Sequence, residues 1–165
     1  MSISQISNYL IQIRDVNESK LWMGPNFKTK IQDVGEDLAF QPPVIGVHCI
    51  AEIIAHMTAW QKDASLKIKH GRGKLLDSDP ENWKTIEELK TNGWKNLLNE
   101  YQASLTELLE LIKNENDEFL DRAYYDIDFK SHFPYRFMVE GILHHSIYHL
   151  GQIGLILKII KISSQ

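Results

Sequence analysis

The segment from residue 134 to residue 161 is the most apolar stretch of the chain, yet polar side chains stand at its centre. Residues four apart lie on one face of a helix, about one turn from each other. A buried polar atom without a partner costs on the order of 1 to 3 kcal/mol. The pattern therefore predicts a helix whose buried face holds a polar centre that some other group must satisfy. Read at heptad spacing, this face carries Met138, Ile142, His145, His149, Gln152, Ile156 and Ile159.

His145 and His149 are four residues apart, so they present two imidazoles side by side. Such a pair is a usual way for a helix to hold a borderline transition metal. His56 lies on the predicted buried stripe of an earlier helix, among isoleucine, methionine and tryptophan. Because two stripes that face one core can bring all three together, we expect a three-histidine metal site. A hydrogen-bonded core cluster without metal is the alternative.

The other histidines have simpler interpretations. His144 is about 100° around the helix from its neighbour at 145, so it faces a neighbouring helix or water. His70 and His132 lie in or beside predicted loops and are expected at the surface. His48 precedes a helix, where it lines the mouth of a pocket or serves the helix entry.

Four further residues near the histidines have open roles. Cys49 is two helical turns before His56, or about 10 Å along the axis, which is too far to share a metal. Trp60, one turn after His56, is a candidate wall of a cavity. Glu52 and Glu140 are candidate second-layer partners or proton acceptors, although most such glutamates face solvent.

Composition narrows the class of protein. A chain of 165 residues is expected to form a single domain, residues 1–165. A net charge of −4 gives no basic surface for nucleic acid. No apolar run reaches the roughly 18 to 20 residues of a membrane span, and no signal peptide begins the sequence, so a cytoplasmic location is expected. The lone cysteine excludes an intrachain disulfide, and a metal site must therefore use histidine and oxygen.

Helical periodicity dominates the sequence and predicts an all-α fold. Long helices are expected at about residues 4–20, 48–69, 85–114 and 134–161. The connections predicted between them are a short helix at 27–34, a loop at 35–46, an exposed stretch at 71–83 and an irregular crossover at 117–133 that lies over one end of the bundle. Thr85 and Glu88 have the spacing of a capping box at the start of the third long helix.

Three segments carry a resemblance to the DinB-like superfamily, which includes YfiT-like proteins: LWMGP at 21–25, VHCIAEIIAHMTAW at 47–60 and HSIYHLGQI at 145–153. The resemblance implies a four-helix bundle of up-down-down-up topology, often a homodimer, with a divalent metal ion, nickel or zinc. The implied ligands are His56, His145 and His149. Cys49 departs from the family pattern, in which serine is common, and this affects helix capping more than metal binding.

Three neutral histidines leave coordination positions open, which is typical of catalytic rather than structural sites. A metal held in this way can acidify bound water for hydrolysis or bind a thiolate for transfer. The resemblance implies either a metal-dependent hydrolase or an S-transferase or isomerase that uses a low-molecular-weight thiol. The expected partner is therefore a small-molecule substrate or thiol, without nucleic acid or membrane. A metal-stabilised module for binding or stress response is the non-enzymatic alternative.

One side of the last helix has the pattern of a surface that contacts another helix. Small and large groups alternate there, which allows another helix to approach closely. The resemblance also implies dimers, so we expect a homodimer through this side. Its residues are Gly141, His144, Tyr148, Gly151 and Leu155.

Overall fold

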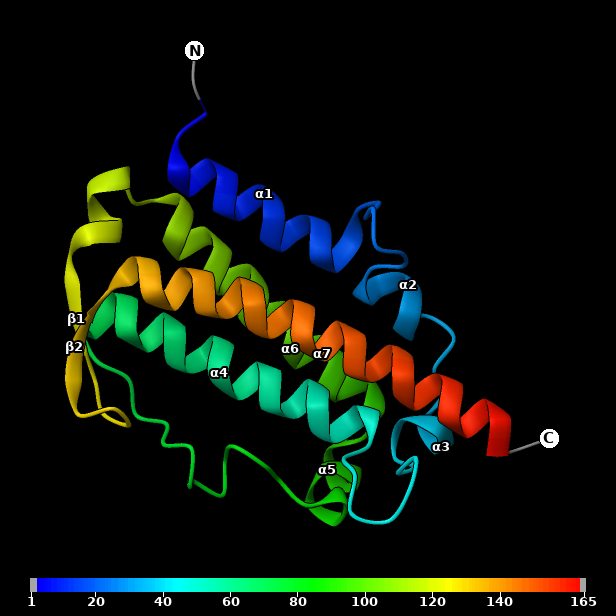
Figure 1. Ribbon diagram of the computed structural model, residues 1–165. Coiled ribbons are helices and arrows are strands. Elements are labelled where there is room, and N and C mark those ends of the chain that lie inside the picture. The colour runs from blue at the N-terminus through cyan, green and yellow to red at the C-terminus, as the bar shows by residue number, and fades with distance from the viewer. Residues whose placement is uncertain (1–2, 164–165) are drawn as a thin grey trace.

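Four long helices make up most of the computed structural model, which describes residues 3–163. They are α1 (Gln5–Glu18), α4 (Ile50–His70), α6 (Trp94–Lys113) and α7 (Tyr135–Ser163). Helix α4 packs against α6 and α7, and α1 packs against the same two helices. In Figure 1, α1 and α7 run from left to right, whereas α4 and α6 run in the opposite direction. The mostly helical fold predicted from periodicity is confirmed.

The ends of these helices follow local capping chemistry. The Ser4 hydroxyl accepts a hydrogen bond from the Ser7 N–H and begins α1. The Glu52 carboxylate accepts the backbone N–H of Cys49 at 2.7 Å, just before α4. Gly71 ends α4 with a φ of +71°, a left-handed conformation that glycine adopts without strain. The first, second and last long helices therefore begin and end within about two residues of their predicted bounds.

The prediction of one continuous third long helix is wrong, because this part of the chain forms two helices. Helix α5 (Ile86–Asn92) begins with the expected capping box, in which Thr85 and Glu88 bind each other's backbone N–H. Gly93 then takes a φ of +81° and a ψ of 150°, and α6 begins directly after it. The left-handed φ of Gly93 breaks the helical hydrogen bonding, while the apolar periodicity continues across the break.

The prediction for residues 117–133 is also corrected. This segment forms a short 3₁₀ helix, η1 (Asp117–Asp121), and an antiparallel hairpin of β1 (Ala123–Asp126) and β2 (Ser131–Pro134). Side chains alternate between buried and less buried positions along β1, with Tyr124 and Asp126 inside. A four-residue strand is too short for this alternation to stand out in the sequence. The hairpin lies across one end of the bundle, as expected for a crossover (Figure 1).

Two short helices occupy the connection between α1 and α4. Helix α2 (Phe27–Ile31) confirms the predicted short helix, although it ends three residues earlier. Helix α3 (Glu36–Ala39) forms one turn inside the stretch that was expected to be a loop. Its formation is compatible with Pro42 and Pro43, which come after it ends. Within residues 3–163, no helix has the length and apolar character needed to cross a membrane.

Candidate metal centre

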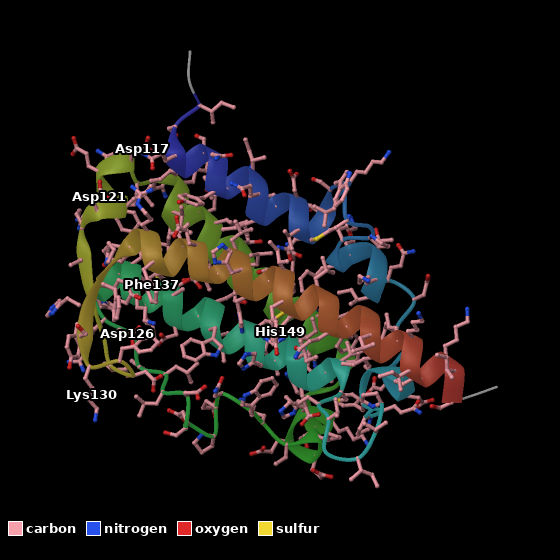
Figure 2. All side chains as sticks on the ribbon, in the orientation of Figure 1. Asp117, Asp121, Asp126, Lys130, Phe137 and His149 are labelled. Carbon is pink, nitrogen blue, oxygen red and sulfur yellow. The ribbon has the colours of Figure 1, made fainter. Side chains whose placement is uncertain are left out.

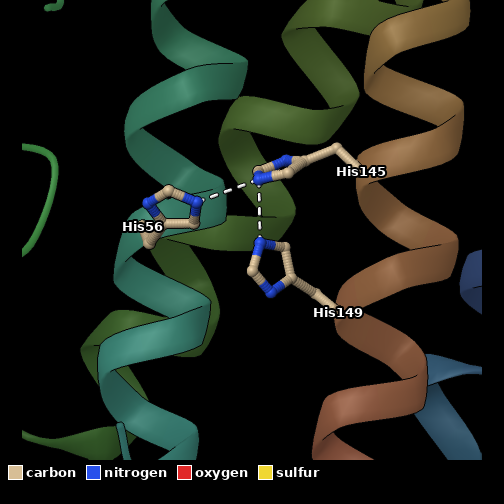
Figure 3. A group of neighbouring side chains, drawn as sticks. All are labelled: His56, His145 and His149. Carbon is tan, nitrogen blue, oxygen red and sulfur yellow. Dashed lines mark hydrogen bonds between the residues drawn. The ribbon is translucent and has the colours of Figure 1, made fainter. Parts of the chain in front are cut away.

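Three imidazoles from two helices meet in the bundle interior. Helix α4 supplies His56, and α7 supplies His145 and His149 (Figure 3). The Nε2 atom of His145 lies 2.9 Å from Nε2 of His56 and 2.8 Å from Nε2 of His149. The ligand atoms of the three residues all lie within 4.8 Å of one another. The residues that the sequence selected as candidate ligands are therefore brought together.

The outer nitrogen of two of these rings is fixed by an acceptor. Nδ1–H of His56 donates to the backbone carbonyl of Asn82 at 3.1 Å. Nδ1–H of His149 donates to the side-chain oxygen of Gln152 at 2.6 Å, and the amide nitrogen of Gln152 donates to the Tyr148 hydroxyl at 2.9 Å. Because a neutral imidazole carries one proton, Nε2 of both His56 and His149 presents a lone pair toward His145.

This arrangement leaves a place for a cation. A proton on Nε2 of His145 can point toward only one of its two nitrogen neighbours, so the lone pair of the other neighbour faces a nitrogen with no proton between them and is repelled. A positive ion between the rings would turn that repulsion into coordination. Neutral imidazole nitrogen suits zinc and nickel, and an outer-nitrogen hydrogen bond is the usual support of a histidine ligand. The residues present therefore fit a divalent transition metal.

The connection between α4 and α5 supports the centre from one side. The Trp83 ring is stacked between two histidine rings, with centroids 3.9 Å from both His48 and His56. The Trp60 indole N–H donates to the side-chain oxygen of Asn82 at 2.8 Å. Asn82 thus positions His56 through its backbone and Trp60 through its side chain. Asn82 was not predicted from the sequence, because the connection has no periodicity that predicts burial.

The structure gives positions and partners for Glu52, Cys49 and Glu140, whose roles the sequence left open. Glu52 lies 3.0 Å from Nδ1 of His48 and caps α4, and it makes no hydrogen bond or ion pair with the three clustered histidines. Cys49 is fully buried, and burial raises the pKa of its thiol to about 12. It lies outside the histidine cluster, as predicted. Glu140 accepts a hydrogen bond from the Tyr9 hydroxyl.

The remaining histidines lie at the surface. His70 and His132 are exposed, as their predicted positions in or beside loops require. His144 is exposed on α7 and belongs to the side predicted to contact another helix. His48 is half exposed, with its ring stacked on Trp83. The structure therefore separates three histidines in the bundle interior from four on its outer surface.

A groove leads from the surface to the centre. It has a volume of about 560 Å³ and reaches His56 and His145, with Trp60 along its wall. His149 is only 2% exposed and lies behind them. Figure 2 shows His149 near the middle of α7, and Asp126 and Phe137 toward the hairpin, where the groove ends. The centre is thus open on one side rather than sealed by side chains.

Burial keeps the three rings neutral. It is the main reason that the pKa of His145 falls to about 3 and that of His149 to about 4, with the neighbouring histidines adding to both shifts. Burial also lowers the pKa of His56, although its bonds to Asn82 oppose the change. Because a histidine must lose its proton to bind a metal, the centre is ready for metal at neutral pH.

These shifts predict how stability depends on pH in protein without metal. The folded pKa values of His145 and His149 are below the ordinary value, so the stability they contribute is present above about pH 6.5 and is lost as the pH falls toward 4. Each contributes a slope of at most about 1.4 kcal/mol per pH unit. Denaturant unfolding between about pH 7 and pH 5 should therefore show a smaller loss for His145→Gln than for the parent. The exposed His132→Gln is the control, and equal losses in all three proteins would refute the assignment.

Comparison with known families agrees with this geometry. A family model described as the DinB superfamily matches residues 26–153, which is well over half of the chain and includes all three clustered histidines. The comparison with curated proteins returns no match. The extent of the family match shows that the chain belongs to the DinB superfamily.

Proposed function

We propose that this member of the DinB superfamily binds a divalent metal ion, nickel or zinc, on His56, His145 and His149 and acts as a metal-dependent hydrolase. The observation that carries the proposal is the convergence of three Nε2 atoms at the inner end of an open groove. A metal ion with three histidine ligands and free coordination positions supplies a Lewis acid that acidifies water at neutral pH.

Residues of the chain would orient the metal ligands, exclude water from one side of the centre and accept a proton during this reaction. Asn82 and Gln152 hold protons on the outer nitrogens of His56 and His149, so the inner nitrogens stay free for metal. The stacked Trp83 ring covers one face of His56 and excludes water there. Glu140 lines the groove and offers a carboxylate that can accept a proton from a reacting molecule.

Two other functions remain as alternatives. An S-transferase or isomerase that uses a low-molecular-weight thiol would need the same open metal, with a thiolate in place of water. A non-enzymatic metal-stabilised module would need the metal but not the groove. The groove beside His56 and His145 therefore supports the two enzymatic functions over the third. Cobalt-substituted protein separates them: added thiol changes the spectrum of a transferase site, whereas ester hydrolysis that is independent of thiol supports the hydrolase.

The proposed ligands predict the result of single substitutions. His56→Ala, His145→Ala and His149→Ala should each release most of the metal, because three ligands act together and each loss leaves only two. Metal content is measured by elemental analysis after desalting, and hydrolytic activity on a panel of esters is measured on the same samples. Activity should fall at least about 100-fold in each variant.

His70→Ala and His132→Ala are matched controls, since both histidines are exposed and outside the cluster. They should keep full metal content and full activity. Full metal occupancy in two of the three cluster variants would contradict the ligand set. Normal occupancy in the parent without ester hydrolysis or thiol response would leave a metal-binding module and remove the enzyme proposal.

We also propose that the long helices form a four-helix bundle of up-down-down-up topology. The direction of the helices in Figure 1 supports this, because α1 and α7 run one way and α4 and α6 run the other. The packing of α1 and α4 against the same two neighbours also supports it.

A homodimer through α7 is proposed as the assembly. Gly141, His144, Tyr148, Gly151 and Leu155 are all exposed, so the side predicted to contact a partner is left uncovered within the chain. Light scattering at tens of micromolar protein should give about twice the 19.1 kDa mass of one chain. Leu155→Glu should shift the mass toward one chain, because it would bury a charge against the partner. A mass near that of a single chain in the parent would contradict the dimer.

A further inference from the structure

The groove extends well beyond the histidines. From His56 and His145 it continues between α4, β1 and α7 to Lys67 and Asp126, which lie near the hairpin. Gly141 lies along its α7 side, and a Cβ atom added there would have no neighbour within 4 Å beyond the adjoining residues and backbone of its own helix. The groove can therefore hold an elongated molecule whose reacting end is at the histidines.

A buried group with an excess of negative charge forms the far end. Lys67 Nζ lies 2.9 Å from Asp126 Oδ2 and 3.1 Å from Asp63 Oδ2, and all three residues are at most 6% exposed. Asp63 Oδ2 has no hydrogen bond of good geometry despite this proximity. Two carboxylates thus face one ammonium, so the three side chains together carry one net negative charge.

The carboxylates are held firmly in place. Asp63 Oδ1 accepts the backbone N–H groups of Lys74 and Leu75 at 2.6 and 2.9 Å. Asp126 Oδ1 accepts two further backbone N–H groups, and hydrogen bonds with Lys67 and this backbone keep the pKa of Asp126 below its ordinary value despite burial. A Cβ atom at Gly73 would clash with the Asp63 carboxylate, which is held by its own hydrogen bonds, so glycine suits this position. These contacts fix the negative charge of Asp126 at the end of the groove.

The other charged side chains of the groove wall are also negative, and the wall is rich in aromatic rings. Asp77 and Glu140 also line the groove, and Lys67 is the only Lys or Arg among the described residues of its wall. The aromatic lining includes two rings that remain strongly exposed, Phe129 at 62% and Phe137 at 45%. Carboxylates together with aromatic faces are the features that bind organic cations.

We propose that the groove selects a substrate with an apolar body and an alkylammonium or other organic cationic group, which lies toward Asp126 and Glu140 while the reacting bond reaches the histidines. This inference rests on the proposed function, because it assigns a substrate class to the same centre. An anionic substrate would meet the excess of carboxylates, and a neutral one would not make use of them.

The test uses a cation that cannot bind a metal. Phenylbutyl-trimethylammonium is compared with its neutral carbon isostere, in which a tert-butyl group replaces trimethylammonium, by isothermal titration calorimetry on purified protein of measured metal content. The cation should bind at least about tenfold more tightly than the isostere. Glu140→Gln should lower the ratio of the two affinities by about threefold or more, since Gln keeps an acceptor for Tyr9 but loses the charge. Glu118→Gln, at an exposed position outside the groove, should leave it unchanged.

Two glycines of α7 give a matched steric control. Gly141→Ala and Gly151→Ala add the same methyl group to exposed helical positions with free space around them, but only Gly141 lines the groove. Gly141→Ala should weaken binding of the cation at least about fivefold, whereas Gly151→Ala should leave its affinity unchanged. Both lie on the side proposed for the dimer, so Gly151→Ala also controls for assembly.

The outcomes separate this inference from the proposed function. Equal affinity of cation and isostere would overturn the charge preference, and normal binding in Gly141→Ala would overturn the location. Either failure in protein with full metal content leaves the metal proposal intact. Selective cation binding in protein that takes up no metal would support the groove and contradict the metal centre.

Discussion

The convergence of three imidazole Nε2 atoms is the interaction on which the rest of the site depends. Its geometry is set from outside, because Asn82 and Gln152 take the outer protons of His56 and His149 and leave their lone pairs facing inward. Burial prevents the rings from gaining protons at neutral pH, as the low pKa values of His145 and His149 show. A cluster of this kind is costly in an apolar core unless a cation joins it. Without a cation, the fold is thus less stable than it would be with well-packed apolar side chains at these three positions.

The bundle supplies two rigid walls, and the irregular segments complete the site. Helices α4 and α7 lie side by side and carry the three histidines (Figure 1). The connection after α4 brings Trp83 against His56, and the hairpin brings Asp126 to the far end of the groove. The two helices carry the three histidines, whereas the connection positions His56 through Asn82 and the hairpin shapes the far end of the groove.

Much of the interior was predictable from the sequence, whereas the surroundings were not. The spacing of His145 and His149, and the position of His56 on an apolar stripe, follow directly from helical periodicity. Asn82 lies in a polar connection without period, and its burial arises from long-range contacts with α4. Lys67 and Asp126 were missed for a related reason, because charged residues are expected at the surface and only their mutual pairing makes burial possible. The break at Gly93 depends on one backbone angle that periodicity does not encode.

X-ray absorption at the metal edge of protein loaded with zinc or nickel tests the three-histidine coordination directly. Three imidazole nitrogens are expected at about 2.0 to 2.1 Å from the metal, accompanied only by exchangeable oxygen ligands such as water. The His145→Ala variant should lose this signal, because its Nε2 lies between the other two. Coordination by the sulfur of Cys49, or by carboxylate oxygens in place of the imidazoles, would contradict the three-histidine centre.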